Sequence, residues 1–562
     1  MRHCSILFLI VIAMCIAARA QNPPESGTIS GRVVTDSGQP LSGATLFVRS
    51  MNSINSSRNT TSDADGNFRV NGLEPGLYTI VANAPAYAID PLSTTTYYRV
   101  GDSVRLEMVR GGVITGTVTN STGEPVIGVR VRVVRIRDAQ GQMPRMPSFS
   151  FNEQSTDDRG IYRIYGLLPG TYLVSAGGGG GFSGSSFNPF ENDIPTFAPS
   201  STRDTAAEIS VRAGEESSAD IRYRGESGYG ISGTVKAAGA GGVSVTLKAP
   251  GSSVPLAATF QLPGTRGFAF NGLADGEYVL RAQEVLSGPQ AGIPVLASSP
   301  TKRVTIKGAS ITGLELVTMP MTSISGRIAL EPSKLPECQG KRPPLFAEMV
   351  VQLPRSDKES DDDERLYAGL IGGAASPDAK GALVWRNVMP GRYRFEPRFY
   401  AHYWYLQSIT ISTTGPKPQK IDAAANWTVA KPGEQITNLT ITLAEGAASI
   451  HGRLPLAEAA TVQPGTIFYL VPAEPDKATD VLRFFMSDVA ADGTFTLNNL
   501  PPGKYFALMQ TNVDAQIATL AKLREPEPEA ATARAKLRRT AEAKKAEIEL
   551  KPCQNLADYQ LK

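Results

Sequence analysis

G-L-E-P-G-L-Y, at residues 72–78, is the first of five near-copies of one seven-residue phrase that organises the whole chain. The other copies are G-L-L-P-G-T-Y at 166–172, G-L-A-D-G-E-Y at 272–278, N-V-M-P-G-R-Y at 387–393 and N-L-P-P-G-K-Y at 499–505. The closing tyrosines are therefore spaced by 94, 106, 115 and 112 residues. A period of roughly 100 residues is too long for a solenoid unit and has the size of one small domain. The sequence thus predicts a string of similar domains.

The same order of strand and turn signals surrounds every copy of the phrase. A strand that contains glycine comes first, as in S-G-R-V at 30–33 and T-G-T-V at 115–118. A second strand follows, such as V-R-V-R-V-V at 129–134, whose alternation indicates one wet face. Next come an Asp-Gly turn, a short alternating strand and then the phrase, whose Pro and Gly end that strand and reverse the chain. About seven short strands per copy, with turns every 8–12 residues or so, predict a β-sandwich.

These motifs together resemble the carboxypeptidase regulatory-like domain. The resemblance rests on G-x-V, G-x-P-L-x-G, D-x-x-G-x-F/Y and G-L-x-P-G-x-Y, which copies one and two match closely and copies three to five match better in their later halves. It spans residues 27–562 in total. It implies a prealbumin-like, Ig-like β-sandwich, related in shape to carbohydrate-binding-like and Cna-B-type modules, in a secreted or envelope bacterial protein. It implies no reaction, because such domains accompany enzymes, receptors and adhesive proteins alike.

The expected fold class is all-β, with a tandem array of about five seven-stranded sandwiches and one helix near the C-terminus. Boundaries fall in short polar joints before each glycine-containing strand. The expected sandwiches are residues 27–110, 111–226, 227–319, 320–446 and 447–562. The second carries a Gly-rich insertion at 177–200, and the fourth is rich in aromatic residues. Residues 528–546 of the fifth are rich in Ala, Arg, Lys and Glu and form the predicted helix.

Residues 1–20 have the pattern of an export signal. Arg2 and His3 precede the apolar run Ser5–Ala18, which is too short to span a bilayer, and Ala18–Ala20 reads as a small-x-small cleavage site. A lipid attached at Cys15 is the alternative. No later stretch approaches 18 uninterrupted apolar residues or so, and we expect no transmembrane segment in the mature chain. The expected location is the periplasm, the cell surface or the extracellular space.

The net charge of the chain bears on its possible partners. The chain has 56 Lys and Arg against 53 Asp and Glu, a net charge of +3 that falls to +1 without Arg2 and Arg19. That balance is not the signature of a nucleic-acid-binding protein.

After removal of the signal, only two cysteines remain, Cys338 and Cys553. In an exported protein they could pair as a disulfide or stay as two loop thiols, and both readings stay open because the cysteines fall in adjacent sandwiches.

Patterns for catalysis are not found in the sequence. A zinc carboxypeptidase needs His-x-x-Glu and a distant His, whereas the mature chain offers only His402 and His451, with Tyr405 and Leu454 three residues later. Neither a nucleophile elbow nor a phosphate-binding loop occurs. We therefore expect no enzyme activity and no cofactor.

Acidic side chains in turns and loops are candidate calcium ligands. They occur in the turns at 63–66 and 157–160 and in the loop 357–364. Aspartate is common in such turns because its side chain accepts hydrogen bonds from the turn backbone. An acidic loop is usually solvated and holds no metal. We expect no metal site.

The strongest candidate for binding is F-Y-A-H-Y-W-Y at 399–405, with five aromatic residues in seven. On a strand, Tyr400, His402 and Trp404 would share one face, and Phe399, Tyr403 and Tyr405 the other. One face would belong to the core, and the other could stack on a sugar ring. The alternative is a structural role, in which these aromatic residues only pack a large pair of strands. The candidate binding residues are Tyr400, His402, Tyr403, Trp404 and Tyr405.

Several functional hypotheses follow from these observations. The first is a non-catalytic exported protein for binding or adhesion at the bacterial envelope, with a polysaccharide or an envelope protein as partner. The second is a structural spacer or stalk. An accessory subunit of a secreted hydrolase or transport system, and an unrecognised hydrolase, are the further alternatives. The oligomeric state is not specified by the sequence.

Overall fold

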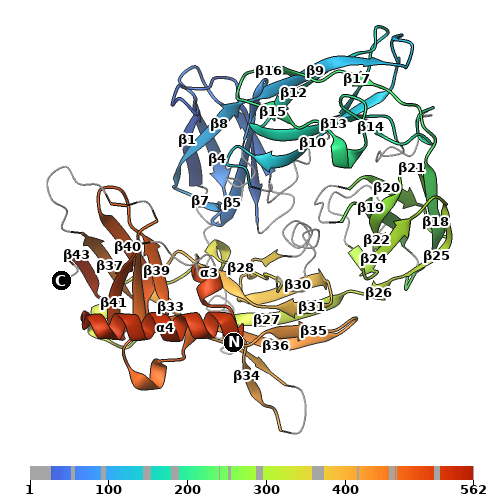
Figure 1. Cartoon of the computed structure of the whole chain (residues 1–562). Helices are drawn as coiled ribbons and strands as arrows, with labels where there is room; N and C mark the ends of the chain where they lie inside the picture. The colour runs from blue at the N-terminus through green and yellow to red at the C-terminus, as the bar shows by residue number, and fades with distance from the viewer. Residues whose placement is uncertain are drawn as a thin grey trace, which may run out of the picture. The chain divides into compact units, whose positions relative to one another are not determined.

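The computed structural model describes residues 27–51, 57–89, 96–142, 153–178, 189–239, 241–250, 255–285, 295–356, 373–413, 417–454, 462–463, 465–511 and 519–560. Their strands form a tandem array of two-sheet sandwiches, so the predicted all-β fold class is confirmed (Figure 1). The export signal 1–20 and the acidic loop 357–364 lie outside the described residues. The chain divides into two compact units, one of residues 1–84 and 94–108 and the other of residues 85–93 and 109–562. The first unit is essentially sandwich 1.

Sandwich 1 builds one sheet around its first strand. That sheet has the order β4 (Asn67–Leu73), β1 (Gly27–Thr35) and β8 (Ser103–Arg110), and β6 (Tyr87–Ala88) pairs with residues 109–110 of β8. The other sheet has the order β3 (Ser57–Thr61), β2 (Thr45–Ser50), β5 (Leu77–Asn83) and β7 (Tyr98–Arg99). Strand β1 is antiparallel to β4 and parallel to β8.

Sandwiches 2 and 3 repeat this plan. In sandwich 2, β9 (Gly112–Thr119) lies between β12 (Ile161–Leu167) and the parallel strands β16 (Glu216–Ser218) and β17 (Ile221–Arg222). Its other sheet contains β10 (Arg130–Asp138), β11 (Glu153–Ser155), β13 (Gly170–Ala176), β14 (Thr196–Phe197) and β15 (Ile209–Val211). In sandwich 3, β18 (Tyr229–Lys236) lies between β21 (Gly267–Leu273) and β25 (Ile311–Val317). Its other sheet contains β19 (Gly242–Lys248), β20 (Ala257–Gln261), β22 (Gly276–Val285), β23 (Val295–Ser298), β24 (Lys302–Ile306) and β26 (Met319–Pro320).

Sandwich 4 contains the longest strand among the described residues. Its main sheet has the order β30 (Ala382–Val388), β27 (Thr322–Glu331), β36 (Gln435–Glu445), β33 (Trp404–Ser412) and β34 (Lys420–Asp422). Facing it are β29 (Ala374–Ala375), β28 (Val350–Gln352) and β32 (Glu396–Arg398), and a pair formed by β31 (Gly391–Tyr393) and β35 (Thr428–Ala430). The core between them contains all the buried tryptophan of the described chain, Trp385 and Trp404.

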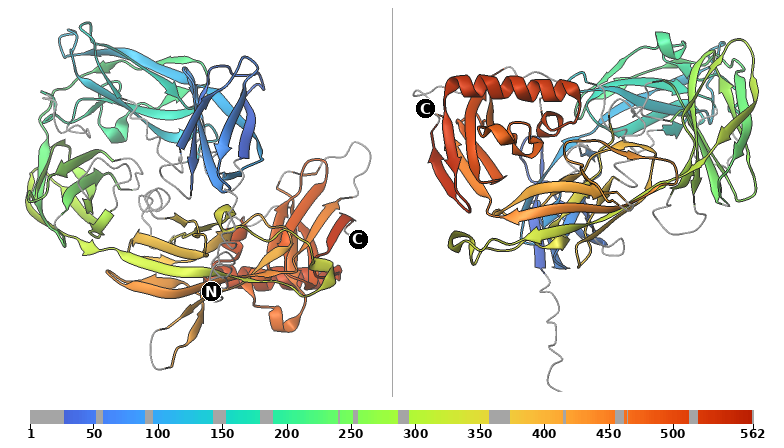
Figure 2. Two further views of the ribbon diagram at one scale, coloured as in Figure 1. Left: turned by 180° about the vertical axis from the view of Figure 1, so that it is seen from behind. Right: turned by 90° about the horizontal axis from the view of Figure 1, so that it is seen from below.

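Sandwich 5 adds a helical layer to the two sheets. One sheet has the order β40 (Thr494–Leu500), β37 (Ala448–Arg453) and β43 (Asn555–Tyr559), and the other has β39 (Phe485–Asp488), β38 (Ile467–Pro472), β41 (Gly503–Gln510) and β42 (Glu547–Leu550). Helices α3 (Leu520–Leu523) and α4 (Pro528–Lys544) follow β41. Helix α4, predicted over 528–546, lies along β38 and β41 (Figure 2). Leu537 and Ala541 pack there, because this sheet buries side chains on both faces.

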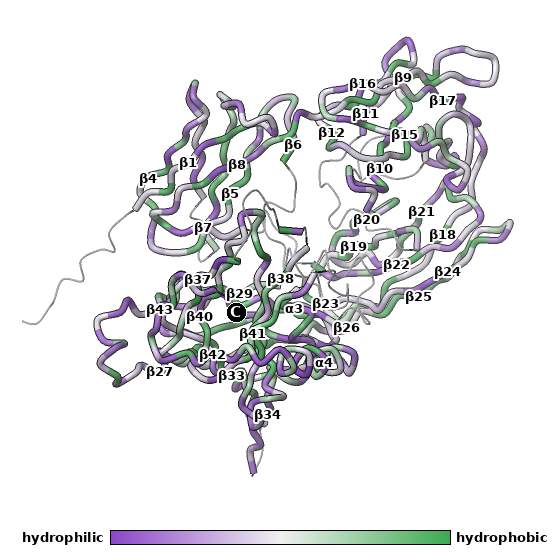
Figure 3. The backbone as a smooth tube through the Cα atoms, turned by 60° about the vertical axis from the view of Figure 1, so that its left-hand side comes forward, coloured by the Kyte–Doolittle hydropathy of each residue, from purple (hydrophilic) through white to green (hydrophobic). Residues whose placement is uncertain are grey.

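Hydropathy follows the strands in the way that a sandwich requires. Apolar and polar residues alternate along many strands (Figure 3), as in β4, where Phe68 and Val70 are buried and Asn67 and Arg69 are exposed. None of the helices in the described part of the chain is long and apolar enough to cross a membrane.

The opening strand of each sandwich contains a glycine because a neighbouring part of the sandwich packs very close to it. These glycines are Gly31, Gly116, Gly233, Gly326 and Gly452. A Cβ atom on the first four would lie only 2.0–2.4 Å from a backbone carbonyl oxygen of the neighbouring parallel segment, and on the fifth 2.2 Å from the Phe495 ring. No side chain fits in that space, so the G-x-V motif is a packing requirement.

The seven-residue phrase forms a turn that its tyrosine closes. Its first residue has a positive φ in every copy, between 57° and 73°, which explains why only Gly or Asn occurs there. The last residue donates a hydrogen bond of 2.7–2.9 Å from its hydroxyl to the carbonyl four residues earlier. These tyrosines are Tyr78, Tyr172, Tyr278, Tyr393 and Tyr505. Burial raises the pKa of Tyr172 to about 12, so this hydroxyl keeps its proton at physiological pH.

Tyr172→Phe should destabilise the protein by about 1–3 kcal/mol, because it leaves the carbonyl of Leu168 without its partner inside the fold. Urea unfolding monitored by circular dichroism would measure the change. Tyr165→Phe is the matched control, since Tyr165 lies in the same sandwich and is 67% exposed. Equal stability of the two variants would contradict a structural role for the hydroxyl.

Candidate functional site

The aromatic segment 399–405 is not the continuous strand that its sequence predicts. Only Trp404 and Tyr405 belong to β33, while residues 399–403 form a loop and a turn. Trp404 is 3% exposed and lies in the core of sandwich 4, whereas His402 is exposed. The predicted alternation of faces is therefore wrong. The turn closed by the Trp404 N–H and the Ala401 carbonyl breaks the period of two.

The segment is held by residues of sandwich 5. The Asn499 side chain donates from Nδ2 to the carbonyls of Ala401 and Trp404, both at 2.7 Å. The backbone N–H groups of Gly446 and Ala447, which join β36 to β37, both donate to the carbonyl of Tyr403. Desolvation by burial raises the pKa of the Tyr405 hydroxyl above its usual range. The backbone of this segment thus forms part of a joint between the two sandwiches.

Charged side chains cross the same joint. Arg394 of sandwich 4 donates to the carbonyl of Ala521 and forms an ion pair of 3.9 Å with Glu525. The Trp427 indole N–H donates to the Glu527 carboxylate at 3.0 Å, just before α4. Because these partners are partly buried, they fix the position of the α3–α4 region against sandwich 4 more firmly than exposed ion pairs would.

Cys338 and Cys553 are joined by a disulfide in this joint. Cys338 ends a short 3-10 helix, Pro336–Cys338, and is fully buried. Cys553 lies in the turn between β42 and β43, and its N–H donates to the carbonyl of Gly446 at 3.0 Å. The bond links positions that are 215 residues apart in the chain.

The remaining sequence candidates have structural roles. His451 lies on β37 with Nδ1 3.2 Å from the Thr496 hydroxyl. The Asp63 carboxylate accepts from the N–H groups of Asp65 and Asn67, and Asp157 makes the equivalent bonds in sandwich 2. Within the described ranges, no group of three or more His, Cys, Asp or Glu side chains is arranged to hold a metal ion.

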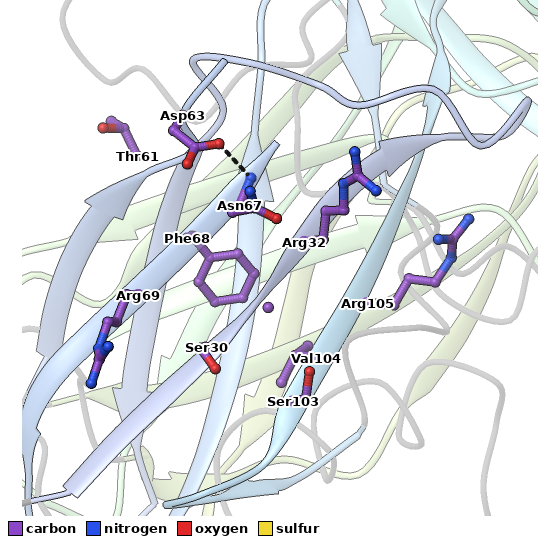
Figure 4. A pocket seen from close by; sticks show the side chains of 11 residues that line it. Ser30, Arg32, Thr61, Asp63, Asn67, Phe68, Arg69, Ser103, Val104 and Arg105 are labelled. Carbon is purple, nitrogen blue, oxygen red and sulfur yellow. Dashed lines mark hydrogen bonds between the residues drawn. The ribbon is translucent and has the colours of Figure 1, made fainter. Parts of the chain in front are cut away.

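A basic hollow on sandwich 1 was not anticipated from the sequence. It has a volume of about 580 Å³ and lies on the outer face of the sheet formed by β4, β1 and β8 (Figure 4). Its arginines are Arg32, Arg69 and Arg105, one from each strand and all exposed. Arg32 and Arg105 are neighbours in the parallel register, and Arg69 lies on the other side of Phe68. We use the name basic hollow for this site.

The arginines of the basic hollow have no acidic partner in the described residues. The Arg32 Nε–H donates to the backbone carbonyl of Asp65 and the Arg69 Nε–H to the Asn71 amide, both within 2.9 Å. No carboxylate lies within ion-pair distance of the three guanidinium groups in the described part of the chain. The only carboxylate of the lining, Asp63, accepts turn hydrogen bonds. The sequence feature that could have indicated this site is the presence of an arginine at an outward position in each of the three strands.

Comparison with known proteins supports the fold of the first sandwich. Residues 28–108 match the family model of the carboxypeptidase regulatory-like domain. Sandwich 1 is similar to that domain. The resemblance inferred from its motifs is confirmed there. No protein with a curated description matches the chain.

The solved structures that match this chain have low identity and low TM-scores. The minor pilin GBS52 of Streptococcus agalactiae has 12% identity over 35% of this chain and 96% of its own, with a TM-score of 0.20. Two B repeat units of the collagen-binding protein Cna of Staphylococcus aureus have 11% identity over 75% and 100%, with a TM-score of 0.13. The Bacillus anthracis TIE protein has 10% identity over 78% of each chain, with a TM-score of 0.15. These similarities carry no argument about function.

Proposed function

We propose that this chain is an exported, non-catalytic scaffold of the bacterial envelope, in which sandwiches 4 and 5 act as one stiff pair. The observation that carries the proposal is the joint between them. Only Gly446 and Ala447 separate β36 from β37, and the disulfide and the Asn499 hydrogen bonds hold both sides of that connection. Neighbouring domains move freely by default unless such contacts hold them. A stiff pair is what a spacer or stalk requires.

The non-catalytic part of the proposal has separate support. The family matched by residues 28–108 is a regulatory-like kind of domain rather than a catalytic one. The repeated phrase and the strand glycines serve the fold in every copy, as the tyrosine hydrogen bonds and the close strand contacts indicate. Export, which the first twenty residues predict, is part of the same proposal.

Binding of a polysaccharide or an envelope protein is the second candidate function. The basic hollow favours it. The aromatic segment supports it less well, because Trp404 is buried and the carbonyls around it are engaged by Asn499. Tyr400 and Tyr403 are half-buried, and Lys341 lies 4.4 Å from the centre of the Tyr403 ring. One face of the Tyr403 ring is therefore already occupied by a cation.

Asn499→Gly should loosen the joint, at a cost of about 1–2 kcal/mol, while keeping a residue that tolerates the positive φ of this position. Spin labels at Val429→Cys in sandwich 4 and Lys504→Cys in sandwich 5, both exposed, would report the distance between the sandwiches. We expect one narrow distance distribution that broadens in Asn499→Gly.

Asn387→Gly is the control for this experiment. Asn387 occupies the same position of the phrase in sandwich 4 and also has a positive φ. The control should leave the distance distribution narrow. A broad distribution in the protein with native Asn499 would overturn the proposal of a stiff pair.

A further inference from the structure

The basic hollow of sandwich 1 holds three arginines against one carboxylate, Asp63, which forms no ion pair with them in the described part of the chain. Arg32 of β1 and Arg105 of β8 occupy paired positions. Arg69 of β4 lies opposite Ser30 of β1. Like charges at neighbouring sheet positions repel one another and reduce the stability of the fold. Such an arrangement becomes favourable when an anion binds between the guanidinium groups, since each of them can donate two parallel hydrogen bonds to an acidic group.

Equivalent sheet positions in sandwiches 2 and 3 do not gather unpaired arginines. Arg163 of β12, which corresponds to Arg69, forms an ion pair of 3.0 Å with Glu216. Thr117 of β9 corresponds to Arg32 and donates from its N–H and hydroxyl to Asp220. In sandwich 3, Glu315 stands at the position of Arg105. The fold itself therefore does not require three arginines together on this face.

We propose that the basic hollow binds an acidic polysaccharide, with carboxylate or sulfate groups of the sugar units pairing with Arg32, Arg69 and Arg105. The neutral polar side chains of the lining complete the site as hydrogen-bonding partners for sugar hydroxyls. They are Ser30, Thr61, Asn67 and Ser103. The hollow crosses three strands on an open sheet face, which suits a segment of an extended polymer better than an enclosed small molecule (Figure 4).

Other polyanions fit the basic hollow less well. Single-stranded nucleic acid is bound by aromatic side chains on which bases stack. The only aromatic residue of the lining, Phe68, is 4% exposed and has no free face to offer. The chain also lacks the strong positive charge of a nucleic-acid-binding protein, with a net charge of +3. A sugar polymer uses both the arginines and the hydroxyl and amide groups of the site.

The test is calorimetric titration of the full mature protein with polygalacturonate, dextran sulfate and neutral dextran, and with single-stranded DNA and polyphosphate for comparison. We expect binding of one or both acidic polymers, weakened by salt, and no binding of dextran. The variant Arg32→Gln/Arg69→Gln/Arg105→Gln should bind at least about tenfold more weakly. A preference for polygalacturonate indicates carboxylate as the acidic group, and a preference for dextran sulfate indicates sulfate.

Arg163→Gln/Arg327→Gln/Arg453→Gln is the matched control. It removes the same charge from outward positions of equivalent strands in sandwiches 2, 4 and 5, and should bind like the unmodified protein. Arg32→Lys/Arg69→Lys/Arg105→Lys keeps the charge and should bind more tightly than the glutamine variant. Thermal melting establishes that each variant is folded, and the glutamine variant should melt no lower than the unmodified protein because like-charge repulsion is removed.

The outcomes that would overturn the proposal are distinct from those that concern the joint. The proposal would be overturned if neither acidic polymer bound, or if neutral dextran bound equally well. It would also be overturned if the matched control lost as much affinity as the glutamine variant. Tighter binding of single-stranded DNA or polyphosphate than of both acidic glycans would overturn it as well. None of these variants touches the contacts between sandwiches 4 and 5, so their results bear on the basic hollow alone.

Discussion

Gly233→Ala is expected to destabilise sandwich 3 by about 3 kcal/mol, at the upper end of the range for overpacked sites. The added Cβ would lie 2.0 Å from the carbonyl oxygen of Leu314, a backbone atom of the parallel strand β25. That oxygen cannot move away without separating β18 from β25. Hydrogen exchange measured by mass spectrometry would localise the effect, because the amides of these two strands should exchange faster than those of other sandwiches.

Gly267→Ala provides the control on the adjacent strand. Gly267 pairs with Thr234, the residue after Gly233, but a Cβ there would find its nearest neighbour 3.9 Å away. Alanine at such a strand position is expected to be neutral or to stabilise the fold by about 0.5–1 kcal/mol. If both variants exchanged at the same rate, close strand approach would not be the reason for the glycine.

Cys338→Ser/Cys553→Ser is expected to lower the free energy of unfolding of the joined sandwiches by about 2–5 kcal/mol. The disulfide closes a separation of 215 residues, and a long closed segment restricts the unfolded chain strongly. Guanidinium unfolding followed by tryptophan fluorescence would measure the change. All three tryptophans, Trp385, Trp404 and Trp427, lie in sandwich 4, so the signal reports that part of the chain.

A reducing agent supplies the control for the disulfide variant. It should shift the unfolding midpoint of the unmodified protein toward that of the variant and leave the variant unchanged. Unfolding of the variant at the same guanidinium concentration as the unmodified protein would show that the disulfide adds nothing to the joint.

Much of the fold could be predicted because its determinants are local and repeated. The phrase ending in Tyr172 marks a turn in any context, since a left-handed first residue and a reversing Pro-Gly are properties of a few neighbouring residues. The glycine-containing strand, the Asp-Gly turn and the helix of residues 528–544 are likewise short-range signals. Five repetitions made each signal stand out, and they yielded the fold class.

The candidate site could not be read in the same way. The predicted faces of residues 399–405 assumed a continuous strand, but a turn at His402 and Tyr403 interrupts it, and the hydrogen bonds that stabilise this turn come from Asn499 and Gly446. The basic hollow joins Arg32 to Arg105, which are 73 positions apart in the sequence and meet only through parallel strand pairing. Neither arrangement follows from residue spacing.

The sequence by itself determined the all-β array, because turn and strand preferences act over a few residues and recur in each copy. The tertiary structure alone decided that Cys338 meets Cys553, that Trp404 is core rather than surface, and that three arginines share one sheet face. Those results depend on which strands pair and how two sandwiches meet, and such long-range contacts are selected by the packing of the whole domain rather than by any local preference.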